Sequence, residues 1–120
     1  MALTKSSTVV HNNVTLTAGA GNTTSSDQDL TGSYRQVARV RFTNGATGPT
    51  VQAQCQIQVA ETSTGDYTTL ATVYGGTVNS AITEVEVEIP DATQHMRFVS
   101  GSNTGQAVTL RAVLDTITAI

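Results

Sequence analysis

Residues 51–59 read Val51-Gln52-Ala53-Gln54-Cys55-Gln56-Ile57-Gln58-Val59, with apolar residues and glutamines in strict alternation. Successive side chains of a β-strand point to opposite sides, so this pattern predicts a strand with one core face and one wet face. The wet face carries Gln52, Gln54, Gln56 and Gln58. A helix would scatter these glutamines around its circumference, and we therefore exclude a helix for this stretch.

The same alternation recurs at residues 82–89, where the polar positions are acidic. Val85, Val87 and Ile89 are expected to point inward, and the outward positions are Glu84, Glu86 and Glu88. Pro90 follows and ends the strand, because proline cannot donate a hydrogen bond to the ladder. This segment therefore predicts a second strand with one core face and one acidic face.

Two more segments alternate, and turn residues separate all of them. The inward positions are Ala38, Val40 and Phe42 in one segment, and Val108, Leu110, Ala112 and Leu114 in the other. Shorter candidate strands are residues 9–16, 28–30, 67–74 and 95–100. Seven to eight strands with no helical periodicity predict an all-β fold, an antiparallel β-sandwich or jelly roll. At 120 residues the chain is expected to form one domain, 1–120.

The two ends of the chain differ from the rest, being partly apolar and lacking turn signals. Residues 1–8 and 116–120 are candidate subunit-contact arms, with Ile117 and Ile120 as their apolar contacts. An apolar chain end is either a covered edge strand or a contact with a neighbour. The ends therefore favour, without requiring, a homo-oligomer.

Composition and charge exclude several classes of function. The net charge is −3, and the six basic residues form no run, so we expect no nucleic-acid binding. No apolar stretch reaches membrane-spanning length, and residues 1–7 lack the apolar region of a secretion signal. Cys55 is the single cysteine, which rules out a disulfide within the chain.

A search for catalytic chemistry finds no nucleophile beside a base. Cys55 is expected to be a small core residue, because it lies on the apolar face of its strand. His11 is expected to cap the chain or face solvent, and His95 to begin a strand. Two distant histidines and one buried cysteine make no zinc site. We therefore expect a protein that is not an enzyme and has no catalytic residues, metal or cofactor.

Two surface groups have both a structural and a functional interpretation. The glutamate row is expected to face Arg39, Arg41, Arg97 or Arg111 on adjacent strands, or else to dock onto a basic partner. The three tyrosines could form a carbohydrate-binding patch, or could pack separately at strand ends. They are Tyr34, Tyr67 and Tyr74. Function is thus sought on surfaces.

The chain resembles small virion structural proteins of tailed bacteriophages. The resemblance rests on Met1-Ala2-Leu3-Thr4, on residues 41–50 (RFTNGATGPT), and on residues 97–104 (RFVSGSNT) leading into 108–114. It implies a capsid decoration (cement) protein, a compact β fold that often assembles as a trimer where capsid subunits meet. A neck or tail component is an alternative within the virion, and a carbohydrate- or receptor-binding module is an alternative outside it. The implied partners are the major capsid protein or other virion proteins, after synthesis in the bacterial host cytoplasm.

Overall fold

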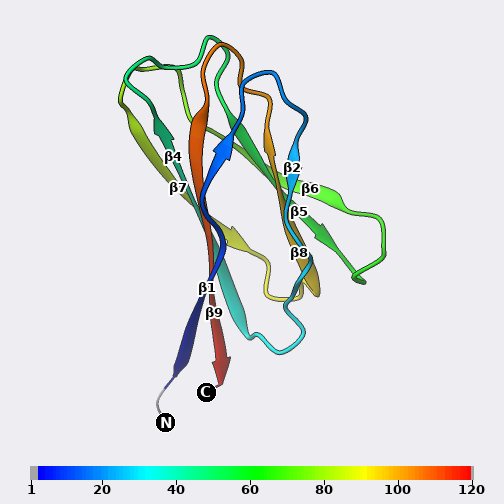
Figure 1. Ribbon diagram of the computed structural model, residues 1–120. Coiled ribbons are helices and arrows are strands. Elements are labelled where there is room, and N and C mark those ends of the chain that lie inside the picture. The colour runs from blue at the N-terminus through cyan, green and yellow to red at the C-terminus, as the bar shows by residue number, and fades with distance from the viewer. Residues whose placement is uncertain (1–2, 120) are drawn as a thin grey trace.

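The computed structural model describes residues 3–119, which form two antiparallel β-sheets packed face to face (Figure 1). The four-stranded sheet has the order β1 (Thr4–Leu16), β9 (Val108–Ala119), β4 (Arg35–Asn44), β7 (Ile82–Ile89). The five-stranded sheet has the order β2 (Thr23–Thr24), β8 (His95–Gly101), β5 (Gln54–Ala60), β6 (Thr68–Tyr74), and β3 (Gln28–Asp29) also pairs with β8. The predicted antiparallel β-sandwich is confirmed. Nine strands replace the seven to eight expected, since β2 and β3 are only two residues long.

The core lies between the sheets and is made by every second residue of the long strands. Ala38, Val40 and Phe42 on β4 are fully buried, as their alternation predicts. The predicted inward residues of β9 are buried as well: Val108, Leu110, Ala112 and Leu114. On β7, Ile89 is buried, while Val85 and Val87 are partly buried and pack against the core. In residues 3–119, no helix is long and apolar enough to cross a membrane.

The strand predicted over residues 51–59 is confirmed over most of its length and is wrong at its first residue. Cys55 and Ile57 are fully buried, but Val51 is 50% exposed and lies outside β5. The backbone of Val51 pairs with Thr104 in an isolated bridge instead of joining the β5 ladder. The pleat of β5 therefore does not extend to Val51, and its side chain leaves the core.

His11 is buried, so the expectation that it caps the chain or faces solvent is wrong. The pairing of β1 with β9 shifts register on both sides of His11, and Asn13 nearby has a positive φ of 53°. A β-bulge re-aims side chains, which explains why a polar stretch sends one residue inward. The His11 ring packs edge-on against Phe98 at 6.5 Å between centroids, and its buried Nε2 has no hydrogen-bond partner. Burial lowers the pKa of His11 below 6.5.

The two ends of the chain pair with each other as β1 and β9. Thr4 pairs with Ala119 and Ser7 with Asp115, and the ends lie side by side beyond the body of the sandwich (Figure 1). Ile117 is half-buried and pairs with both Lys5 and Arg35. The described parts of the expected arms are thus strands of one sheet, and Ile120 lies outside the described residues. Their role in subunit contacts stays a prediction.

Candidate functional site

The outer face of the five-stranded sheet carries three of the predicted glutamines. Gln54, Gln56 and Gln58 are half-buried and alternate with core residues along β5. Gln58 Oε1 accepts a hydrogen bond from Arg97 Nε at 2.8 Å, and Gln58 Nε2 donates to Gln56 Oε1 at 3.1 Å. This face is therefore crossed by side chains that bind one another.

The same chain of contacts continues from Arg97 to the half-buried Asp27 and His95, where the connector between β2 and β3 runs along β8. The Arg97 guanidinium lies 3.9 Å from the centre of the Tyr67 ring. The Tyr67 hydroxyl donates to Asp27 Oδ1, and Asp27 Oδ2 lies 2.7 Å from His95 Nδ1. The hydrogen bond to Asp27 raises the pKa of Tyr67. We call these side chains the Asp27 network: Asp27, Gln56, Gln58, Tyr67, His95 and Arg97.

Gln52 and the three tyrosines do not join into one patch. Gln52 precedes β5, and its Oε1 accepts a hydrogen bond from Gly76 N at 3.2 Å, at the far end of β6. Tyr67 and Tyr74 stand at opposite ends of β6, about 23 Å apart at the usual rise per residue. Tyr34 lies before β4, where its backbone N–H donates to the carbonyl of Ile117. The tyrosine patch is therefore wrong, since Tyr34 and Tyr74 are exposed at separate places and Tyr67 packs against Arg97.

The outer face of the four-stranded sheet is built from rows of side chains across the strands. Register places Arg41 between Glu84 of β7 and Arg111 of β9. The next row places Arg39 between Glu86 and Val113, and the row after it places Val37 between Glu88 and Asp115. Residues directly opposite in an antiparallel pair have Cβ atoms about 5 Å apart, so each row brings its side chains into contact.

Within the described residues, two of the three glutamates, Glu86 and Glu88, are salt-bridged, as one of the two interpretations of this row predicts. Arg39 Nη1 lies 3.1 Å from Glu86 Oε1, and Arg39 Nε lies 2.6 Å from Asp115 Oδ2. Arg35 Nη2 lies 3.7 Å from Glu88 Oε1, with both side chains more than half exposed. The expectation that Arg97 also faces this row is wrong, because β8 belongs to the other sheet.

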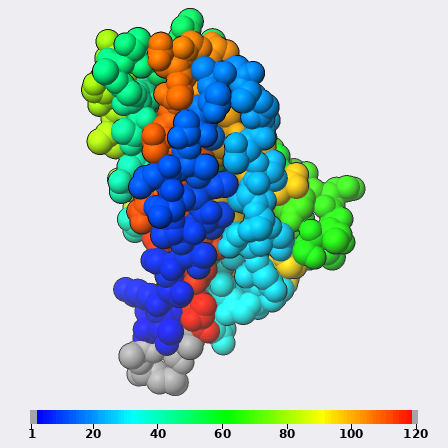
Figure 2. Space-filling model, viewed as in Figure 1, coloured from blue at the N-terminus to red at the C-terminus, as the bar shows by residue number. Residues whose placement is uncertain are grey.

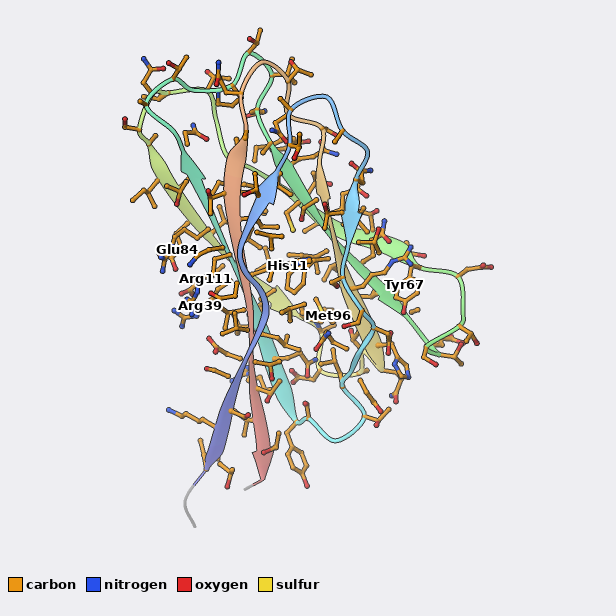
Figure 3. All side chains as sticks on the ribbon, in the orientation of Figure 1. His11, Arg39, Tyr67, Glu84, Met96 and Arg111 are labelled. Carbon is orange, nitrogen blue, oxygen red and sulfur yellow. The ribbon has the colours of Figure 1, made fainter. Side chains whose placement is uncertain are left out.

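The fold gathers basic residues that are scattered in the sequence. Five of the six Lys and Arg residues lie on this outer face, with four of the nine Asp and Glu residues: Lys5, Arg35, Arg39, Arg41, Arg111, Glu84, Glu86, Glu88 and Asp115. Figure 3 shows Glu84, Arg111 and Arg39 together on this side, away from Tyr67. The sequence predicts Arg39, Arg41 and Arg111 beside the glutamates, and it misses Lys5, Arg35 and Asp115, which the register between distant strands adds.

One row of this face is left with an excess of positive charge. Arg41 and Arg111 stand directly opposite each other, and within residues 3–119 neither has a carboxylate at ion-pair distance. Both are half-buried and line an open hollow of about 460 Å³, whose other lining residues are Ser7, Val9, Arg39, Glu84, Val113 and Asp115. We call Arg41 and Arg111 the arginine pair. Its chemistry suits an oxyanion, since guanidinium groups bind carboxylates through paired hydrogen bonds.

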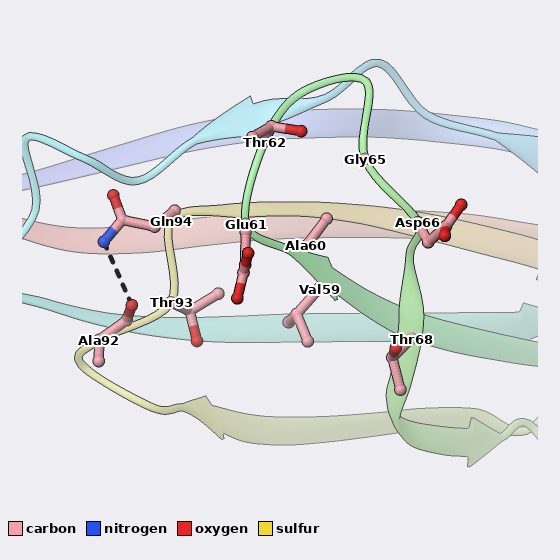
Figure 4. Close-up of a pocket in the computed structure, with 10 residues that line it drawn as sticks. All are labelled: Val59, Ala60, Glu61, Thr62, Gly65, Asp66, Thr68, Ala92, Thr93 and Gln94. Carbon is pink, nitrogen blue, oxygen red and sulfur yellow. Dashed lines mark hydrogen bonds between the residues drawn. The ribbon is translucent and has the colours of Figure 1, made fainter.

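A second hollow lies at the end of the sandwich, between the loop that joins β5 to β6 and the loop that joins β7 to β8. This end groove has a volume of about 520 Å³ (Figure 4). The carboxylates of Glu61 and Asp66 and the amide of Gln94 line it, with the hydroxyls of Thr62, Thr68 and Thr93. Glu61 and Asp66 are exposed. In the part of the chain that the structure describes, no group of three His, Cys, Asp or Glu residues could hold a metal ion.

Cys55 is a core residue, as its strand position predicts. Its side chain is fully buried, and burial raises the pKa of its thiol to about 11. A thiol with this pKa stays protonated at neutral pH, and the thiolate is the nucleophilic form. Cys55 therefore contributes packing and not reactivity.

Comparison with known proteins shows the fold and no family. No protein-family model and no curated protein matches the chain. The SPBc2 prophage-derived protein YomS is 10% identical, with a TM-score of 0.58 over 97% of this chain and 96% of that one. The PBSX exported protein XepA is 14% identical (TM-score 0.57; 96% of this chain, 37% of that one). VP2 of infectious bursal disease virus is 9% identical (TM-score 0.57; 98% and 33%). The chain thus shares its antiparallel β-sandwich with these three proteins.

Proposed function

We propose that this chain is a non-enzymatic structural protein of a bacteriophage virion, and that it decorates the capsid. The observation that carries the proposal is the likeness to YomS, a prophage-derived protein whose sandwich corresponds to this one over 97% of this chain and 96% of that chain. The PBSX exported protein XepA is a second protein with the same sandwich. The prophage origin of YomS agrees with the resemblance to virion proteins in the sequence.

The strand order gives further support. Counting β2 and β3 as one interrupted strand, the sheets run β1-β9-β4-β7 and β2-β8-β5-β6. This is the strand order of an eight-stranded jelly roll, an architecture that recurs in viral capsid domains and lectins. VP2, from a viral particle, has the same sandwich. A jelly-roll domain is well suited to a shell, because its two broad sheet faces offer contact area without a cleft.

The surface also suits a protein that binds its neighbours through polar contacts. Both outer faces are polar, one with the Asp27 network and the other with rows of charged residues. Specific interfaces are rimmed by polar groups and depend on complementarity, not on a large apolar patch. In this proposal the protein forms a homo-oligomer, with a trimer favoured, and contacts the major capsid protein.

The direct test is the composition of purified virions. Quantitative mass spectrometry should find this chain in high copy number, and the protein added to undecorated heads should bind them and raise their resistance to heat. A copy number of about six or twelve with ring assemblies would favour the neck or tail instead. A chain absent from virions would contradict the proposal.

The end groove supports a second candidate, a carbohydrate- or receptor-binding module. Its carboxylates, hydroxyls and amide are groups that hydrogen-bond to sugar hydroxyls, and lectins are among the jelly rolls. A glycan array tests this directly. Binding should be lost in a Glu61→Gln, Asp66→Asn variant and kept in a Glu84→Gln variant. An array without binding would exclude this candidate and leave the virion proposal intact.

A further inference from the structure

We propose that the arginine pair is a docking site for a second copy of this chain, whose β5–β6 loop inserts Glu61 and Asp66. This inference rests on the proposed function, because it supplies one contact of the proposed oligomer. It joins two surfaces that lie on different parts of one molecule: the centre of the four-stranded sheet's outer face, and the acidic loop beside the end groove.

The arginine pair is a like-charge contact within the four-stranded sheet. Arg41 and Arg111 are directly opposite in the β4–β9 register. Like charges at directly opposite positions destabilise an antiparallel pair. Glu84 stands across from Arg41 on the other side, so one carboxylate shares a row with two guanidinium groups. An incoming carboxylate would neutralise this row.

In the neighbouring row of the same face, the charge of Arg39 is neutralised by carboxylates. Arg39 contacts two carboxylates, Glu86 and Asp115, at 3.1 and 2.6 Å. Arg41 is its neighbour two residues away and has the same orientation, yet in residues 3–119 it has no such partner. Arg39 binds carboxylates of its own chain. We assign carboxylates of a second copy to the arginine pair.

The occupant is argued from charge complementarity. Glu61 and Asp66 are exposed on the β5–β6 loop, and Asp91 is exposed at the start of the adjoining β7–β8 loop. Within the described residues, none of the three is in an ion pair. In Figure 2 the β5–β6 loop projects from the body of the molecule, so its carboxylates can enter a hollow on another copy. The hollow at the arginine pair, of about 460 Å³, can take carboxylate side chains.

The geometry makes this contact heterologous. Figure 1 places the β5–β6 loop on the far side of the molecule from the outer face of the four-stranded sheet. Each copy therefore offers one basic face and one acidic loop, and can contact two neighbours. Contacts of this kind close into rings when the rotation between copies allows it, and otherwise extend.

Analytical ultracentrifugation of the wild type and two double variants tests the inference. The wild type should associate with rising concentration, and raising salt from 50 to 500 mM should weaken the association at least tenfold, because exposed charges are screened. The variants Arg41→Gln, Arg111→Gln and Glu61→Gln, Asp66→Asn should each be monomeric on their own. Mixed together they should form a one-to-one heterodimer and nothing larger, since one intact face and one intact loop remain.

Two controls separate docking from folding. Arg35→Gln removes an exposed cation from the same face, outside the hollow, and should leave association within twofold of the wild type. The double arginine variant should melt at the same temperature as the wild type or above it, since it removes a like-charge pair. Arg41→Lys, Arg111→Lys keeps the charge but not the paired hydrogen bonds, and should associate more weakly than the wild type.

Three results would overturn the inference. They are a wild type that stays monomeric at millimolar concentration, a double arginine variant that associates like the wild type, and a mixture that fails to form the heterodimer. Virion incorporation is measured separately and tests the proposed function. If the wild type is monomeric but the double arginine variant is lost from virions, another virion protein occupies the arginine pair, which overturns the second copy as occupant and leaves the virion role standing.

Discussion

The two outer faces of the sandwich are both polar, but they differ in whether their charged side chains have partners within the chain. On the five-stranded sheet, Arg97 is hydrogen-bonded to Gln58 and covers Tyr67, and Asp27 binds Tyr67 and His95. On the four-stranded sheet, the row of Arg39 is neutralised and the row of Arg41 and Arg111 is not. Polar groups that bind one another hold strands and loops together, whereas an uncompensated charge is free to bind a partner.

A first expected effect is a pH dependence of the free energy of unfolding through His11, which is buried against Phe98 of the other sheet. Its pKa in the folded protein lies below 6.5, because burial disfavours the charged ring. At a pH between the folded-state and unfolded-state pKa values of His11, the unfolded chain binds a proton that the folded chain does not. The free energy of unfolding should therefore fall as the pH drops through about 6.5. Guanidinium denaturation at pH 7.5 and 5.5 measures this loss.

A matched pair of variants assigns the loss to the buried ring. His11→Leu should abolish the pH dependence between 7.5 and 5.5, and His95→Gln should keep it. An unchanged loss in His11→Leu would place the titrating group elsewhere.

The next prediction concerns the Asp27 network on the outer face of the five-stranded sheet, where the side chains bind one another. Asp27→Ala removes the partner of both Tyr67 and His95, and should cost about 1–3 kcal/mol of unfolding free energy. The raised pKa of Tyr67 should also fall toward 10, which ultraviolet titration detects. Asp66→Ala, an exposed aspartate outside the Asp27 network, is the control and should change neither quantity. Equal stabilities of the two variants would mean that the network contributes nothing to the fold.

A smaller effect is expected at the neutralised row of the other face. Arg39→Gln breaks two ion pairs whose side chains are partly exposed, and should cost less than about 1 kcal/mol. The cost should shrink as salt is raised from 50 to 500 mM, because exposed charges are screened. Urea denaturation at both salt concentrations gives the difference, and a cost independent of salt would point to packing of the arginine stem instead.

The smallest effect should have the opposite sign. Arg111→Gln removes one member of a like-charge pair and should stabilise the monomer by about 0.2–0.5 kcal/mol at low salt. Paired with Arg39→Gln in the same denaturation series, it compares two arginines on one face. A loss of stability equal to that of Arg39→Gln would show that Arg111 serves the fold, and would remove the contrast between the two rows.

The sequence predicts the faces of single strands well, because a period of two is a local property of the backbone. Ala38, Val40 and Phe42 are buried as expected, and the three glutamates of β7 are exposed. It fails at His11, where a bulge interrupts the period, and at Val51, where the backbone leaves the ladder. The alternation of apolar and polar residues does not show where a bulge or the end of a ladder interrupts it.

The candidate sites could not be predicted, because they depend on which strands become neighbours. Arg41 and Arg111 lie 70 positions apart in the chain and meet only through the β4–β9 register. Asp27 and His95 meet because the connector between β2 and β3 runs along β8. The sequence does place Arg41 and Arg111 beside the glutamates, but the contact between the two arginines and the contact between Asp27 and His95 depend on strand pairing between distant segments.

The pairing of Thr4 with Ala119 has a mechanical consequence. The first and last strands are antiparallel neighbours with their free ends at the same edge, so a force that pulls these ends apart acts across the hydrogen bonds of the ladder. It would load one pair at a time and unzip β1 from β9. A force applied along two strands in opposite directions would instead shear many hydrogen bonds together. The two strands should therefore separate at low force when pulled apart at Thr4 and Ala119, and at higher force when they are pulled lengthwise in opposite directions.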